Sequence, residues 1–223
     1  IERVIRSDAG GIGLFRSEFI YMDNGGKLPT EDQQFAIYKL AAESMGMKRV
    51  VIRTAYLGGD KLADCFEMAK ENNPALGYRG IRISLEKDEM FRTQLRAILR
   101  ASVYGNVSIM FPMITSLEEV KAAKVQLERA KKELSANKTA YNKDIEVGVM
   151  IETPAAVMIS GELAREVDFF SIGTNDLLQF TLGMDRTNAK IDSYYNPHHP
   201  ALLKMIRTVS YTHLRAHETS QDL

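Results

Sequence analysis

Charged side chains follow the apolar runs of this sequence at the points where the runs end. Arg16 and Arg53 follow the first two runs, and Glu152 and Asp176 follow the last two. A guanidinium group binds two oxygens of a phosphate or carboxylate at once. Two carboxylates that converge repel each other unless a cation lies between them, and magnesium suits a small set of hard oxygen ligands. These residues therefore predict a site for a small phosphorylated substrate held through a divalent metal ion.

Structural roles for the same four residues remain open at this point. An arginine at a strand end is often an ion-pair partner. Glu152 could complement the dipole of the helix that follows it, and Asp176 could belong to a turn or cap. The functional interpretation is favoured because the charged residues concentrate at successive strand ends.

Five short apolar runs predict the strands that position these residues. The runs cover 11–15, 50–52, 107–111, 145–151 and 167–172. Near-continuous apolarity is typical of strands buried on both faces, as in parallel sheets. Helix starts separate the runs, with N-cap signals at Thr30, Ser116 and Thr153 and a further start at Asp88. This alternation predicts an α/β fold with a parallel sheet.

Two architectures fit that alternation, an open doubly wound sheet and a (β/α)8 barrel. The sequence has no Gly-x-Gly-x-x-Gly at a strand-to-helix turn with an acidic residue about 20 positions later, which disfavours a dinucleotide-binding sheet. Periodicity leaves both open, with a lean to the barrel. In a barrel the carboxyl ends of the strands form the face where active sites lie.

Composition excludes several classes of function. The 223 residues include 29 Lys+Arg and 29 Asp+Glu, and this net charge of zero argues against a nucleic-acid partner. No apolar run approaches the roughly 20 residues that span a bilayer, so we expect no membrane insertion. The single cysteine, Cys65, fits a reducing compartment such as the cytoplasm, and we interpret it as an inert thiol. We interpret His198 and His199 as a surface turn rather than a metal site.

Several motifs resemble the PEP-binding barrel of bacterial phosphotransferase-system enzyme I. They are GLFRSEF at 13–19, RT at 53–54 with GGDK at 58–61, GYR at 77–79, GVMIETPA at 148–155 and FFSIGTNDL at 169–177. The resemblance runs from about residue 9 to 209, which implies an incomplete PEP-binding barrel domain over 1–209. Residues 210–223 depart from the family and are expected to be a foreign tail. Because such barrels typically take about 250 residues, we expect a partial (β/α)8 TIM barrel with about five of eight βα units.

The resemblance also implies roles for single residues. Arg16, Arg53 and Arg79 match arginines that grip the substrate phosphate. Asn175 matches a residue that contacts the substrate phosphate or carboxylate, and Arg186 matches an arginine that closes over the substrate. Arg79 and Arg186 rest on the resemblance alone.

For the metal, the resemblance implies Mg²⁺ held by Glu152 and Asp176, with Asp176 also on the substrate side. The implied reaction moves the phosphoryl group of phosphoenolpyruvate (PEP) to a histidine and releases pyruvate. In the family that histidine lies in a separate N-terminal domain and the proton-donating cysteine on a later strand, so we expect this chain to be a fragment without turnover of its own. Tyr56 departs from the family pattern, because it stands where an aspartate is expected before the GGDK turn.

The implied partners are PEP and pyruvate, the protein's own N-terminal phosphohistidine domain, the histidine-containing phosphocarrier protein and a second copy in a homodimer. The implied pathway is sugar transport by the phosphotransferase system in the cytoplasm. Two alternatives stay open: the barrel of a pyruvate phosphate dikinase or PEP synthase, and a PEP-binding or dimerisation module without catalysis.

Overall fold

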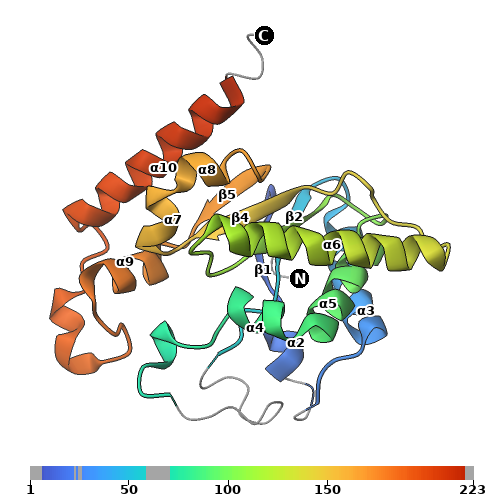
Figure 1. Ribbon diagram of the computed structural model, residues 1–223, viewed down its shortest axis with the longest axis horizontal. Coiled ribbons are helices and arrows are strands. Elements are labelled where there is room, and N and C mark those ends of the chain that lie inside the picture. The colour runs from blue at the N-terminus through green and yellow to red at the C-terminus, as the bar shows by residue number, and fades with distance from the viewer. Residues whose placement is uncertain (1–6, 23, 25–26, 59–70, 219–223) are drawn as a thin grey trace.

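The computed structural model describes residues 7–22, 24, 27–58 and 71–218, with side chains as far as residue 212. Five parallel strands form one sheet in the order β1-β2-β3-β4-β5. They are β1 (Gly11–Arg16), β2 (Arg49–Arg53), β3 (Val107–Phe111), β4 (Val147–Ile151) and β5 (Phe169–Ile172) (Figure 1). All five predicted strands are therefore confirmed.

The strand order separates the two architectures left open by the sequence. A doubly wound sheet reverses its strand order at a switch point. In this sheet each strand pairs with the next one in the chain, which is the order of a (β/α)8 barrel. The register is continuous apart from an irregularity between Ile12 and Phe15 in β1.

Helices connect the strands on the outside of the sheet (Figure 1). They are α2 (Glu18–Met22), α3 (Glu31–Met45), α4 (Ile81–Glu86), α5 (Asp88–Ala101), α6 (Leu117–Ala136), α7 (Pro154–Met158), α8 (Ser160–Leu163), α9 (Thr174–Leu182) and α10 (Pro200–Glu218), with 3-10 turns η1 (Pro74–Leu76) and η2 (Ala189–Tyr194). The predicted starts are confirmed. Thr30 and Ser116 form capping boxes, and the Thr153 hydroxyl accepts from the N–H of Ala156.

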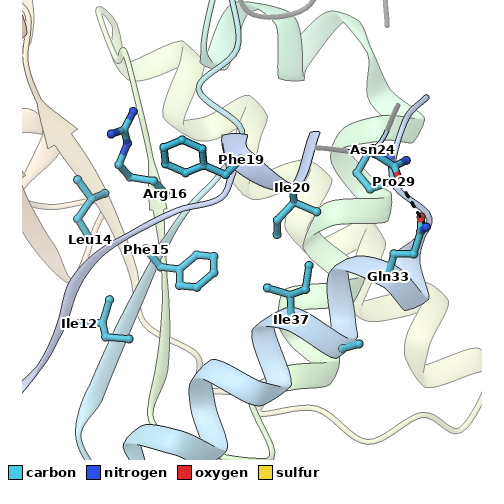
Figure 2. Close-up of a pocket in the computed structure, with 11 residues that line it drawn as sticks. Ile12, Leu14, Phe15, Arg16, Phe19, Ile20, Asn24, Pro29, Gln33 and Ile37 are labelled. Atoms are coloured by element: carbon cyan, nitrogen blue, oxygen red, sulfur yellow. Dashed lines mark hydrogen bonds between the residues drawn. The ribbon is translucent and has the colours of Figure 1, made fainter. Parts of the chain in front are cut away.

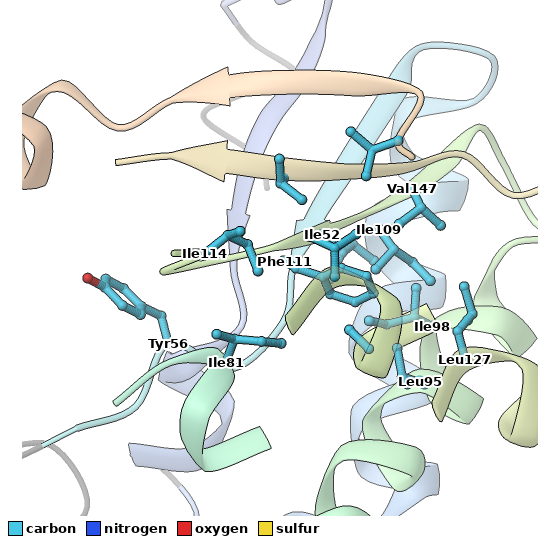
Figure 3. Close-up of a cluster of buried hydrophobic side chains, with 14 of the residues drawn as sticks. Ile52, Tyr56, Ile81, Leu95, Ile98, Ile109, Phe111, Ile114, Leu127 and Val147 are labelled. Carbon is cyan, nitrogen blue, oxygen red and sulfur yellow. The ribbon is translucent and has the colours of Figure 1, made fainter. Parts of the chain in front are cut away.

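The main core lies between the sheet and the helices α3, α5 and α6. Ile52, Ile109 and Phe111 of the strands pack with Leu95 and Ile98 of α5 (Figure 3). Their side chains are inaccessible to solvent, and burying each contributes roughly 1.5–3 kcal/mol. Among the described residues, no helix has the length and apolarity to cross a membrane.

The prediction that every strand is buried on both faces needs one correction. The strands β2, β3 and β4 are almost wholly buried, whereas β1 has exposed positions such as Leu14, at 40%. The physical reason is position in the sheet, because β1 and β5 each pair with a single strand of the described chain. The sequence of β1 is therefore as apolar as that of a buried strand, although several of its residues are exposed to solvent.

Candidate functional site

The carboxyl ends of the strands surround a pocket of about 330 Å³. Because parallel strands point the same way, the residues that follow them gather at one edge. All seven residues proposed from the sequence line this pocket: Arg16, Arg53, Arg79, Glu152, Asn175, Asp176 and Arg186. The structure thus brings together side chains that are up to 170 positions apart in the chain.

Glu18 holds two of the pocket arginines together. Its side chain is fully buried, and its Oε1 accepts from Arg16 Nε at 2.8 Å and from Arg53 Nη2 at 2.7 Å. Charge-assisted bonds of this kind are strong and directional. Glu18 is absent from the residues proposed above, although an acid two positions after a strand-end arginine was a signal that could have identified it.

A buried polar network fixes the backbone that carries Arg53. Ser17 Oγ donates to the carbonyl of Arg53 at 2.7 Å, and Gln94 Nε2 of α5 donates to Ser17 Oγ at 3.0 Å. Gln94 also accepts from the N–H of Ala55 at 2.8 Å. The helix α5 therefore holds both ends of the turn that follows β2.

The two carboxylates are buried side by side. Glu152 Oε1 accepts from the N–H of Met113 at 2.6 Å, while Oε2 is buried without a hydrogen-bond partner in the described chain. Asp176 Oδ2 accepts from the Tyr56 hydroxyl at 3.0 Å, and Oδ1 pairs with Arg186 Nη1 at 3.1 Å. Burial, and then the charge of Asp176, raise the pKa of Glu152 to about 8.

This arrangement fits a magnesium ion. Like charges in a desolvated site repel, and the unpartnered Oε2 of Glu152 is a free hard ligand beside the carboxylate of Asp176. The described residues contain no cluster of three or more His, Cys, Asp or Glu of the kind that cages a metal. Magnesium does not need one, because it usually keeps waters and binds one or two carboxylates plus substrate oxygens.

Tyr56 lies among the arginines. Its ring centroid is 4.5 Å from Cζ of Arg53 and 4.8 Å from Cζ of Arg79. Burial and the nearby carboxylates raise the pKa of Tyr56 well above its usual value, so its hydroxyl stays protonated and donates a hydrogen bond to Asp176. Arg79 itself is placed by a bridge to Gly58, where a Cβ would come within 2.5 Å of the Arg79 Cβ. The close contact between the backbones at positions 58 and 79 therefore requires glycine at position 58.

Asn175 and Arg186 complete the rim of the pocket. Asn175 is exposed in the first turn of α9, and its Oδ1 accepts from the Tyr195 hydroxyl at 2.8 Å. The N–H of Arg186 donates to Gln179 Oε1 at 3.1 Å. No local sequence pattern distinguishes Arg186 from an ordinary loop charge, whereas the structure pairs it with Asp176.

A larger hollow of about 790 Å³ lies between β1 and α3 (Figure 2). Its walls are mainly apolar, including Ile12, Phe15 and Ile37, and Arg16 is the one charged side chain among the described residues that line it. Convergent charged groups are what a phosphorylated substrate needs, so the smaller pocket at the strand ends is the candidate site.

The remaining predictions concern residues outside the described lining of the pocket. Of the two histidines expected in a surface turn, His198 is exposed in a turn, whereas His199 directly after it is half-buried and its Nδ1 accepts from the N–H of Ala201 at 3.2 Å. Cys65 and the GDK part of the GGDK motif, at 59–61, lie outside the described residues. The boundary between a domain over 1–209 and a tail over 210–223 stays a prediction.

The comparisons with known proteins identify the family. A family model described as "PEP-utilising enzyme, PEP-binding domain" matches residues 1–220. The chain belongs to this family of PEP-utilising enzymes. It is 50% identical over 209 residues to the phosphoenolpyruvate-protein phosphotransferase of Geobacillus stearothermophilus and 49% identical over 209 residues to that of Bacillus subtilis. The match covers 94% of this chain and 36% of each relative.

A solved structure bears out the architecture. A citrate lyase from Burkholderia xenovorans superposes on 83% of this chain and 48% of its own chain, with a TM-score of 0.50 at 18% identity. A likeness at this identity concerns the fold alone. Together with the strand order, it confirms the expected partial barrel of five parallel βα units.

Proposed function

We propose that this chain is the PEP- and magnesium-binding domain of a PEP-protein phosphotransferase, enzyme I of the sugar phosphotransferase system. The whole protein would transfer the phosphoryl group of PEP to a histidine and release pyruvate. The observation that carries the proposal is the single pocket lined by Arg16, Arg53 and Arg79 together with the carboxylates of Glu152 and Asp176. The names of the relatives support the same reaction.

Different residues of the pocket would bind different parts of the substrate. The arginines bind the phosphate oxygens, where the planar guanidinium fork offers paired donors. Phosphoryl transfer passes through a loose transition state, so positioning and charge neutralisation supply most of the catalysis. Glu152 and Asp176 would hold magnesium, which when bound supplies positive charge for the phosphoryl and enolate oxygens. Asn175 and Arg186 are placed to contact the rest of the substrate.

The wider assignments are part of the same proposal. The partners would be the protein's own phosphohistidine domain and, through it, the histidine-containing phosphocarrier protein. The intact protein would be a cytoplasmic homodimer. We assign neither the accepting histidine nor the proton-donating cysteine to a residue of this chain, and so expect binding without turnover from the chain alone.

Calorimetric titration tests the proposal. PEP should bind in the presence of Mg²⁺, and Asp176→Asn should abolish the magnesium-dependent part of that binding. Asp144→Asn, in an exposed loop, is the matched control and should bind as the unaltered chain does. Failure of the unaltered chain to bind PEP with Mg²⁺, or unchanged binding by Asp176→Asn, would contradict the proposal.

A further inference from the structure

Tyr56 contacts both halves of the proposed site. It lies three residues after β2, and its side chain is buried, with 5% of the residue exposed. Its hydroxyl donates to Asp176 Oδ2 at 3.0 Å, while its ring lies under the guanidinium groups of Arg53 and Arg79. In Figure 3 the ring stands at the border of the apolar cluster and the hydroxyl points away from it.

We propose that Tyr56 is a positioning residue that links the anion-binding arginines to the metal-binding carboxylate. This inference rests on the proposed function and adds a residue to it. One rigid side chain sets where Arg53 and Arg79 stand relative to Asp176, so the phosphate and metal parts of the site keep a common geometry.

The ring of Tyr56 can hold the guanidinium groups of Arg53 and Arg79 in place without occupying the N–H groups that would bind the substrate phosphate. Neighbouring guanidinium groups repel each other, and an aromatic face attracts each of them without a formal negative charge. A carboxylate at this position would form ion pairs and compete with the substrate phosphate for the same donors. Glu18 already makes such a pair with Arg53, on its Nη2 atom. Tyr56 therefore orients the arginines without neutralising them further.

The hydroxyl has a separate task at Asp176. One carboxylate oxygen receives the Tyr56 hydroxyl and the other receives Arg186 Nη1, so the two donors fix the plane of the carboxylate. Without the hydroxyl, the one donor to the Asp176 side chain among the described residues is Arg186, whose side chain is 39% exposed, and the carboxylate can rotate away from Glu152. The ring and the hydroxyl are thus expected to affect different ligands.

Two substitutions separate these tasks. Tyr56→Phe retains the ring and removes the hydroxyl, whereas Tyr56→Leu removes both. Inorganic phosphate without metal reports on the arginines, and Mg²⁺ alone reports on the carboxylates, both by calorimetry. We expect Tyr56→Phe to bind phosphate within about twofold of the unaltered chain and to bind Mg²⁺ about tenfold more weakly. Tyr56→Leu should also lose about tenfold in phosphate affinity.

The matched control is Tyr104→Leu, which removes a ring that carries Lys39 at 4.2 Å away from the pocket. It should leave both affinities unchanged. Tyr56→Met, which fills more of the volume, replaces Tyr56→Leu if that variant does not fold. A thermal melt shows whether each variant is folded.

A double-mutant cycle separates positioning from a merely structural role. If the ring acts through Arg79, the phosphate losses of Tyr56→Leu and Arg79→Ala should not add. Additive losses, unchanged phosphate binding in Tyr56→Leu, or unchanged or tighter Mg²⁺ binding in Tyr56→Phe would overturn the inference. Because these ligands are phosphate and Mg²⁺ alone, the result stands apart from whether the chain binds PEP, on which the proposed function depends.

Discussion

The backbone N–H of Met113 donates to Oε1 of Glu152 at 2.6 Å, from a residue in the left-handed region with φ of 59°. This conformation costs a non-glycine residue roughly 1–2 kcal/mol. The turn after β3 thus holds backbone strain at the position that orients the carboxylate of Glu152, which we propose as a metal ligand. Since Oε1 accepts from Met113, Oε2 is the oxygen that the proposed metal ion would bind.

The raised pKa of Glu152 predicts a pH dependence of stability in the metal-free chain. The folded state binds this proton more tightly than the unfolded state, whose carboxyl titrates near 4.5. The stabilisation is therefore complete below pH 4.5 and is lost as the pH rises towards about 8. Glu152→Gln, which still accepts from Met113, should remove this loss. Urea denaturation between pH 5 and 8 measures this pH-dependent loss of stability, and Glu128→Gln, at an exposed position, is the control. Equal pH slopes in Glu152→Gln and the unaltered chain would contradict the assignment.

Glu18→Ala should destabilise the fold strongly. The substitution leaves the buried guanidinium of Arg53 without its carboxylate, and breaking a buried pair in this way costs about 3–5 kcal/mol. The control is Glu43→Ala, which breaks the exposed pair with Lys39 and should cost about 0–1 kcal/mol. Free energies of unfolding from urea titration give the comparison. A loss as small as that of the control would show that Glu18 contributes little to holding Arg53.

Gly173→Ala should weaken Mg²⁺ binding at the proposed metal site with little effect on the strands. A Cβ at this position would come within 2.8 Å of the Glu152 Cβ and 2.9 Å of its Oε2. The carboxylate must move, so we expect Mg²⁺ affinity to fall by about tenfold or more, a loss of roughly 1.4 kcal/mol. Gly13→Ala, whose Cβ meets nothing within 4 Å, should leave it unchanged. Calorimetry decides, and unaltered affinity in Gly173→Ala would mean that Glu152 is not a ligand.

Gln94→Leu should loosen the turn that carries Arg53 and Tyr56. The substitution leaves the buried N–H of Ala55 without its acceptor, at a cost of about 1–3 kcal/mol. It also removes the donor to Ser17 Oγ, so phosphate affinity should fall with stability. Gln94→Glu keeps the acceptor for Ala55 and should lose less of both. A Gln94→Leu variant with normal phosphate affinity would show that the network supports the fold without placing the arginines.

Much of the site could be predicted from the sequence because the signals that mark strands, helix starts and strand ends are local. Apolar runs marked the strands, and capping residues such as Thr30 and Ser116 marked helix starts. The carboxyl ends of parallel strands share one edge, so Arg16 and Asp176 could be expected in one place before any contact was known. The family resemblance added Arg79 and Arg186, which no local pattern distinguishes from loop charges.

Tertiary structure alone decided the roles of Glu18, Tyr56 and Met113. Each depends on a partner far away in the chain: Arg53 for Glu18, Asp176 for Tyr56 and Glu152 for Met113. It also decided that β1 is partly exposed, since burial depends on which strands lie beside it. The sequence by itself indicated that Arg16, Arg53, Glu152 and Asp176 reach one pocket, because strand direction and period are local properties. Their pairing and protonation depend on long-range packing, which brings charges together and excludes water from them.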